Sequence, residues 1–375
     1  MSLYTNIHTH IFNIDCAPRR FIGIKLPQII YNRKIVKGVT KVLKYIIPSN
    51  ADILDRYANF LLIGTRKNQS LIWEDLVSAY PHLKTRFVVL SLDMDKMGAG
   101  DPGNNYETQI TQLFEVKQKF PNQLLPFVCV DPRKTYPFGV RTYLEEKFLR
   151  YGFVGIKLYP ALGFYPFDPE LEAVYRFACE KKLPVMVHCT KGGVWFQGKI
   201  GPEHVLPENF NPEPVNKYNY HNQIKDRNRK FKNNFSNPKN YEEVLKVFPN
   251  LKLCFGHFGG SGEIKISQKH GSDTKETNFY LKIKDLMERY DNVYADISYT
   301  LSEIKKIEAT LLADLTHVKY KERIMFGTDF YMTIQENSEK KLVDNLLKCI
   351  SSDDFHQIAA ANSRKYLESD YYKPN

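Results

Sequence analysis

Eight short apolar runs recur along the chain and predict buried β-strands. Each run is rich in β-branched or aromatic residues, and most end in a polar or glycine-containing turn, as buried parallel strands do. Between most pairs lies an amphipathic stretch with helical spacing, for example residues 105–120, 168–182 and 240–248. The eight runs cover residues 4–12, 86–94, 124–132, 152–160, 183–190, 251–260, 292–300 and 323–332.

This alternation of strands and helices is typical of a (β/α)8 TIM barrel, an α/β fold. A doubly wound sheet is the rival architecture, but no glycine-rich phosphate loop follows the first run. We therefore predict a single barrel domain over residues 1–375. Asp168 and Asn240 stand near the starts of two predicted helices, where a side-chain oxygen is expected to cap the first turn.

The composition is that of an ordinary globular protein, with 43% apolar and 25% charged residues. No apolar run approaches the ~20 residues that span a bilayer. The chain enters its first predicted strand without the basic segment and apolar core of a secretory signal. The six cysteines form no CxxC pair, and four lie in apolar runs where reduced thiols are expected. We therefore expect a cytoplasmic protein with no membrane partner.

The net charge of +11 is concentrated in two segments. Residues 13–57 hold nine Lys or Arg against three Asp or Glu, and residues 190–240 hold nine against four. These segments follow the first and fifth predicted strands, so they are long βα insertions. In a barrel such connections lie on the face that carries the active site. We expect the basic charge to overhang the site.

The first predicted strand carries His8 and His10, which point to the same side of a strand because side chains alternate. Two neighbouring imidazoles suit a metal ion, since neutral imidazole is the commonest protein ligand for zinc. Two solvated histidines on a surface strand are the simpler alternative. Only the rest of the chain can decide between them.

Further chemistry-bearing residues stand near the ends of later predicted strands. Val154, Ile156 and Leu158 should face the helices, which turns Lys157 into the barrel, and Met186 should lie inside with His188. His257 and Asp329 end two other runs beside glycines. Taken singly, such residues often have structural roles in hydrogen bonds, helix caps or ion pairs. Together at one barrel mouth they would be costly to bury without a cation.

This order of motifs resembles the amidohydrolase superfamily of metal-dependent barrel enzymes. It is similar in particular to the branch of aminocarboxymuconate-semialdehyde decarboxylase and 2-pyrone-4,6-dicarboxylate lactonase. The resemblance covers nearly the whole chain, and it rests on the motifs HTH, GIKLYP, LPVMVHC, FPNLKLCFGHFGG, NVYADIS, IMFGTDF and IAAANSRKYL in this order.

The resemblance implies a role for each matching residue. His8, His10 and His188 match metal ligands, and His257 matches a histidine that binds metal or polarises the substrate. Asp329 matches the aspartate that touches the metal and takes a proton from its water. The implied ion is divalent, with Zn²⁺ expected. One ion is favoured, and two would bind if Lys157 were carboxylated. The chain departs from the family at Asn6, where an aspartate is usual.

A divalent ion held by three imidazoles and a carboxylate lowers the pKa of a bound water towards ~7. We therefore predict a metal-dependent hydrolase that acts on a small carboxylated amide or lactone, with Asp329 and His257 as catalytic residues. A non-oxidative decarboxylase on the same metal site is the closest alternative. A barrel phosphodiesterase fits less well, because the runs at 124–132 and 152–160 contain no glutamate to bridge metals.

The basic insertions are expected to guide an anionic substrate inward. The candidates are Arg19, Arg20, Lys191 and Lys199, with Lys157 and Tyr159 as the inner anchor. Alternatively, the basic loops pack against an acidic face of a second copy in a homodimer. A non-enzymatic protein that binds anions or nucleic acid through residues 225–235 is the alternative of another class. A basic run of this kind is more often a solvated loop than a binding site, so we expect no nucleic-acid partner.

Overall fold

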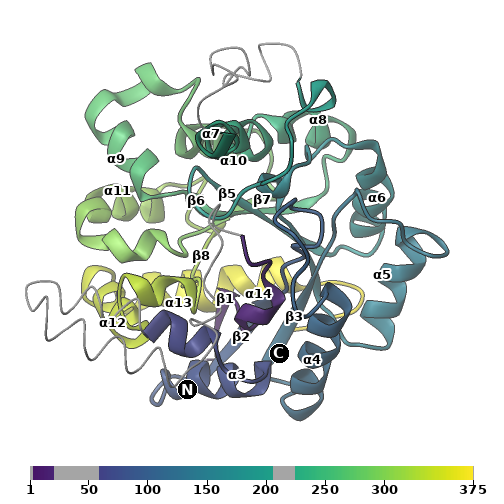
Figure 1. Ribbon diagram of the computed structural model, residues 1–375. Coiled ribbons are helices and arrows are strands. Elements are labelled where there is room, and N and C mark those ends of the chain that lie inside the picture. Colours follow the sequence, from purple (N-terminus) through teal and green to yellow (C-terminus); the bar gives the residue numbers. More distant parts are fainter. Residues whose placement is uncertain (1–2, 21–58, 206–223, 375) are drawn as a thin grey trace, which may run out of the picture.

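Eight parallel strands form one sheet in the order β1 to β8 (Figure 1). This computed structural model describes residues 3–20, 59–205 and 224–374. The sheet closes between its first and last strands, because Ile7 N donates to Phe326 O and Thr9 bridges Phe330. The predicted (β/α)8 barrel is therefore confirmed. The strands are β1 (Tyr4–Thr9), β2 (Thr85–Leu90), β3 (Leu124–Cys129), β4 (Gly155–Leu158), β5 (Pro184–Thr190), β6 (Lys252–Gly259), β7 (Val293–Asp296) and β8 (Ile324–Met325).

Helices surround the strands on all sides in Figure 1. Most of them connect one strand to the next, as the alternating pattern requires. Among the described residues they include α3 (Gln69–Ser78), α4 (Tyr106–Lys119), α5 (Gly139–Leu149), α6 (Glu172–Glu180), α7 (Ile224–Ser236), α8 (Asn240–Val247), α9 (Ser261–His270), α10 (Phe279–Arg289), α11 (Ile304–Thr316), α12 (Glu339–Cys349), α13 (Ser352–His356) and α14 (Asn362–Leu367). No helix in this part of the chain is both long and apolar enough to cross a membrane.

The two predicted helix caps have different outcomes. The Asp168 side chain accepts a hydrogen bond from Glu170 N and caps the short 3-10 turn that leads into α6, as predicted. The prediction for Asn240 is wrong. Its Nδ2 donates to the carbonyl oxygens of Asn234 and Phe235, so the side chain satisfies the end of α7 instead of the start of α8.

Side chains on each strand alternate between the barrel interior and the helix layer. Ile156 and Leu158 pack among the helices, whereas Met186 lies in the interior cluster, as predicted. Val154 was expected to face the helices but belongs to the interior cluster. It precedes β4, which begins only at Gly155, so the strand alternation does not extend to it.

The two ends of the barrel differ. Tyr366 and Leu367 of the C-terminal region join the interior cluster, and Arg86 Nη1 donates to Tyr372 Oη at 2.8 Å. This end is thereby closed. At the other end the βα connections surround a cavity that Ile14, Ala17 and residues 191–194 help to line. Residues 21–57 and 206–223 of the two predicted insertions lie outside the described residues, so their position over the site stays a prediction.

Candidate active site

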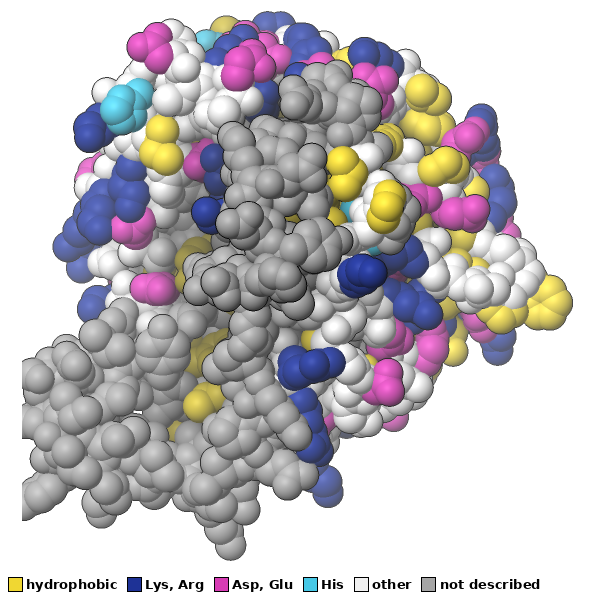
Figure 2. Space-filling model, turned by 45° about the horizontal axis from the view of Figure 1, so that its top comes forward, with side chains coloured by type: hydrophobic (Ala, Val, Ile, Leu, Met, Phe, Trp, Pro, Cys, Tyr) yellow, Lys and Arg dark blue, Asp and Glu magenta, His cyan; other side chains and the backbone are white. Residues whose placement is uncertain are grey.

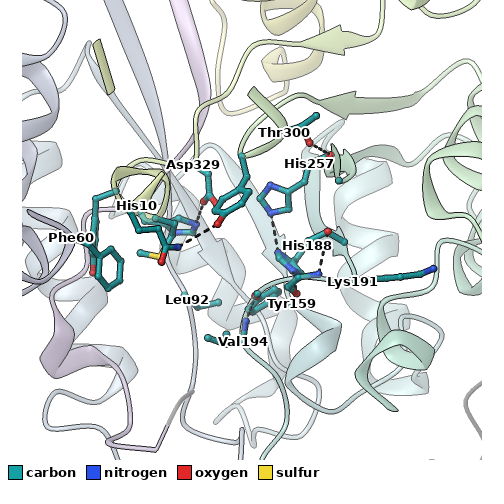
Figure 3. Close-up of a pocket in the computed structure, with 18 of the residues that line it drawn as sticks. His10, Phe60, Leu92, Tyr159, His188, Lys191, Val194, His257, Thr300 and Asp329 are labelled. Carbon is teal, nitrogen blue, oxygen red and sulfur yellow. Dashed lines mark hydrogen bonds and ion pairs between the residues drawn. The ribbon is translucent and has the colours of Figure 1, made fainter. Parts of the chain in front are cut away.

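A cavity of about 670 Å³ opens where the strands end. The sequence-predicted residues Lys157, Tyr159, His188, His257 and Asp329 line it together, and so does His10 (Figure 3). Asp329, His10, His188 and His257 point toward one another in Figure 3. The structure therefore brings to one place residues that are up to about 320 positions apart in the sequence.

His8 and His10 extend from β1 toward the same carboxylate. The Nε2 atoms of His8 and His10 lie 3.5 and 3.2 Å from Oδ1 of Asp329. On its other side His10 places Nδ1 2.9 Å from the carbonyl oxygen of Leu90. His8 places Nδ1 2.8 Å from Oδ2 of Asp296. Both rings are thus fixed at Nδ1 and offer Nε2 to Asp329.

These contacts place hydrogen-bond acceptors against each other, and a bound cation would compensate for this. A carbonyl oxygen only accepts, so His10 must carry its proton on Nδ1, and a neutral His10 then has a lone pair on Nε2. That lone pair faces an oxygen of Asp329, which also only accepts. Burial lowers the pKa of His8 to about 4, so His8 is neutral at pH 7 and presents the same arrangement. The donor atoms of His8, His10 and Asp329 converge within 4.8 Å, and this fits a divalent ion.

A second histidine pair lies beside this group. His257 Nε2 is 3.1 Å from His188 Nδ1, and His257 Nδ1 is 3.2 Å from the carbonyl oxygen of Ser298. His188 Nε2 faces Gly192 O at 3.4 Å. Burial lowers the pKa of both imidazoles, which keeps them in the neutral form that binds metals. In the described residues the ligand atoms converge in two groups, His8–His10–Asp329 and His8–His257–Asp296. His188 belongs to neither group and contacts the centre through His257.

Asp296 was missed as a functional residue, although the NVYADIS motif contains it. It ends β7 and is fully buried. One oxygen contacts His8 Nδ1, and the other accepts from the backbone N–H groups of His257 and Ser298 at 3.0 and 2.9 Å. Burial raises the pKa of Asp296, but the hydrogen bonds that it accepts from the His8 ring and the Ser298 hydroxyl outweigh this effect and hold the pKa far below the usual range. The charged carboxylate therefore sets the tautomer of His8, as residues behind metal-binding histidines do.

Asn6, the departure from the family pattern, joins β1 to the turn after β8. Its Oδ1 accepts from His8 N and Thr328 N, each at 3.2 Å. Its Nδ2 donates to Tyr80 Oη at 2.9 Å and to Thr328 Oγ1 at 2.8 Å. Glu339 Oε1 accepts from these two hydroxyl groups, each at 2.6 Å. This buried network fixes the backbone on both sides of the His8–Asp329 contact.

Asp329 does not end a strand, as the apolar run 323–332 had suggested. β8 stops at Met325, and Asp329 lies in the following turn with a left-handed φ of 64°. Its backbone N–H donates to His8 O at 2.8 Å. The turn can approach β1 because residue 327 is glycine: a Cβ there would lie 2.8 Å from the Cβ of His8. The backbone of β1 thus positions the carboxylate opposite its own histidines.

Lys157 is 2% exposed, and its Nζ has no hydrogen-bond partner in the described residues. Burial lowers its pKa, and the charges of Asp296 and Asp329 oppose that shift. Because it lines the cavity, its amino group is free to bind a ligand. Tyr159 stands between this lysine and His188. Its ring centre lies 4.1 Å from that of His188, and its hydroxyl accepts from Val194 N at 3.2 Å.

The four basic residues predicted to guide a substrate have separate positions. Lys191 lines the cavity, but its Nζ lies 3.0 Å from Glu263 Oε2 and also donates to Thr277 O. Arg19, Arg20 and Lys199 are exposed and are not among the residues that line the cavity. Figure 2 shows Lys and Arg side chains interspersed with Asp and Glu over the described surface. Guidance by these residues stays a prediction.

Comparisons with known proteins found a matching family and similar folds. The sequence model of a family described as amidohydrolase matches residues 95–368. A probable 2-pyrone-4,6-dicarboxylic acid hydrolase from Acinetobacter baumannii, solved with citric acid bound, is similar in fold at 10% identity, with a TM-score of 0.52 and 98% of each chain covered. The 5-carboxyvanillate decarboxylase of Sphingomonas paucimobilis is similar at 12% identity, with the same TM-score and coverage. No curated protein matches the sequence.

Proposed function

We propose that this chain, which belongs to the amidohydrolase family, is a metal-dependent hydrolase that acts on a carboxylated amide or lactone. One observation carries the proposal. The Nε2 atoms of His8 and His10, each fixed by a partner at Nδ1, both face Oδ1 of Asp329. Ring nitrogens and a carboxylate oxygen in this arrangement are a donor set for a divalent cation.

His8, His10, His188 and Asp329 are the residues proposed to hold the ion, with one Zn²⁺ favoured. When bound, such an ion supplies Lewis acidity and lowers the pKa of a water ligand towards ~7. The protein's own residues do the rest. Asp329 accepts the proton of the attacking water and passes it to the leaving group. His257, beside the centre, is the residue proposed to polarise the substrate.

Lys157 is the proposed anchor for the substrate carboxylate. Its Nζ is buried without a hydrogen-bond partner in the described residues, so a carboxylate that entered the cavity would supply the partner that this amino group lacks. Tyr159 borders the same part of the cavity. In the alternative with two metal ions, Lys157 would be carboxylated and would bridge the ions instead of anchoring the substrate.

A non-oxidative decarboxylase is the second candidate, and one observation favours it. The amino group of Lys157, which has no hydrogen-bond partner in the described residues, and the mainly apolar lining of the cavity suit the capture of a carboxylate in a site of low dielectric. The similar fold of 5-carboxyvanillate decarboxylase is compatible with this reading. We also propose a cytoplasmic location, which agrees with six free cysteines, and a homodimer remains a prediction.

The function is tested with a panel of small lactones, amides and amino-muconate-like acids, each paired with its neutral ester. Rates are measured with metal-stripped and zinc-reconstituted protein at low and high salt, with CO₂ release as a separate readout. We expect zinc-dependent hydrolysis of the acids that exceeds that of the esters and falls with salt. Release of CO₂ without hydrolysis would favour the decarboxylase. Equal rates for acids and esters, with no effect of salt, would contradict a carboxylated substrate.

A further inference from the structure

The cavity has two walls of different chemistry. One wall is polar and comes mainly from the ends of β5 and β6, where Thr190, residues 191–193 and Ser261 stand. The other wall is apolar and includes Phe12, Ile14, Phe60, Leu92, Met94 and Tyr331. Figure 3 shows Phe60 on the opposite side of Asp329 from Lys191. The candidate metal centre lies between them.

We infer that the substrate carries an apolar arm, which binds along this apolar wall. The inference rests on the proposed function, because the substrate that carries the arm is taken to react by the hydrolysis proposed above. It goes beyond that function because a small carboxylated amide or lactone needs only the metal centre and Lys157. The apolar wall would then determine which substrates react.

The apolar wall begins directly at the candidate metal centre. The ring of Phe12 lies 5.5 Å from that of His10 and 6.0 Å from that of Tyr331, and the ring of Phe60 lies 5.5 Å from Tyr331. Tyr331 uses its hydroxyl to donate to Phe12 O at 2.8 Å. The hydroxyl is therefore occupied, and the wall presents mostly carbon to the cavity.

The size of the cavity supports the same conclusion. About 670 Å³ lies within the range of pockets that enclose drug-sized molecules. A small acid would leave much of this volume to water beside apolar side chains. Because burying apolar surface is favourable, an arm that displaces this water would gain about fourfold in affinity for each methylene.

The polar wall is less suited to such an arm. Lys191 and Glu263 form an ion pair there, and the Ser261 hydroxyl donates to Glu303 at 2.7 Å. An apolar group against these residues would remove their remaining contact with water without replacing it. The arm is therefore assigned to the wall of Phe12, Phe60 and Leu92.

A kinetic series tests the inference. The substrates are N-acylglycines from N-acetylglycine to N-decanoylglycine, which keep one carboxylate and one amide while the chain grows. With zinc-reconstituted enzyme we expect kcat/KM to rise about fourfold per methylene over at least four methylenes and then to level. In Leu92→Ser the rise should flatten, and Leu92→Met should restore it. Leu149→Ser, an exposed position on α5, is the matched control and should leave the series unchanged.

Binding to the metal-stripped protein gives a readout that does not need turnover. Calorimetric titration with octanoate and with butyrate should show affinity at least tenfold higher for octanoate, with a negative heat-capacity change that Leu92→Ser reduces. Equal affinities, or a heat-capacity change near zero for octanoate, would overturn the inference. If octanoate binds as expected but no N-acylglycine reacts, the apolar wall is supported and the proposed amide hydrolysis fails.

Discussion

The Nε2 atom of His10 lies 3.2 Å from Oδ1 of Asp329, while its Nδ1 faces the carbonyl oxygen of Leu90. Neither partner can donate a hydrogen bond when Asp329 is ionised. A divalent ion held by both residues would satisfy both atoms.

Asp329 is expected to be needed more for turnover than for metal retention, because imidazoles supply most of the proposed ligands. Asp329→Asn should lower kcat/KM by about 10²–10⁴-fold, the usual effect of a positioned acid–base group. The measurement is steady-state kinetics together with the zinc content of the same preparation. Near-normal activity in this variant would remove its catalytic role.

The turn after β5 offers a matched pair of glycines. Gly193 has φ +80°, and a Cβ there would lie 2.5 Å from Tyr159 Oη and 2.9 Å from His188 Nε2. In Gly192 a Cβ would meet only Thr190, at ordinary contact distance. Gly193→Ala should therefore displace His188 and reduce activity at least tenfold, with a loss of stability of about 1–3 kcal/mol. Gly192→Ala should stay within twofold of the parent, and equal effects of the two variants would contradict this account of the turn.

Glu339 predicts a pH dependence of stability. Burial raises its pKa to about 7 from the ordinary value of 4.5, so the folded protein keeps a proton that the unfolded chain releases between these values. The stabilisation is fully present below pH 4.5 and is lost as the pH rises to about 7, by up to about 3 kcal/mol.

The side chain of the Glu339→Gln variant does not titrate, so its free energy of unfolding should not show the part of the decrease with rising pH that Glu339 causes. Urea unfolding of metal-stripped parent and variant at pH 5, 6, 7 and 8 measures the difference. We expect the variant to gain relative to the parent as the pH rises. A difference that is independent of pH would mean that Glu339 is ionised throughout.

The strands were predictable because buried parallel strands are continuous apolar runs, and each of the eight runs overlaps a strand. The end of β8 was not predictable from the sequence. Asn6 accepts a hydrogen bond from Thr328 N, and this contact turns the backbone away from the strand direction before Asp329. Asn240 could not be recognised as a donor to the preceding helix, because its partners depend on how α7 and α8 meet.

In the candidate site, too, some residues could be predicted from the sequence and others could not. His8, His10, His188, His257 and Asp329 were recognisable because they are reactive residue types near the ends of the predicted strands of one barrel. Residues that act through others were missed. Asp296 is one strand-end aspartate among several in the sequence, and only its contact with His8 Nδ1 reveals its role. The apolar wall was not predicted, because its residues come from separate segments that no periodic pattern connects.

The central claim is that β1 and the turn after β8 bind a divalent ion, and elemental analysis tests it most directly. Purified protein, dialysed against zinc and then against buffer, should retain about one equivalent of metal. The double variant His8→Ala/His10→Ala should retain none, whereas the control His82→Ala/His270→Ala, at two exposed histidines, should match the parent. Undiminished zinc in the first double variant, or no zinc in the parent, would contradict the account.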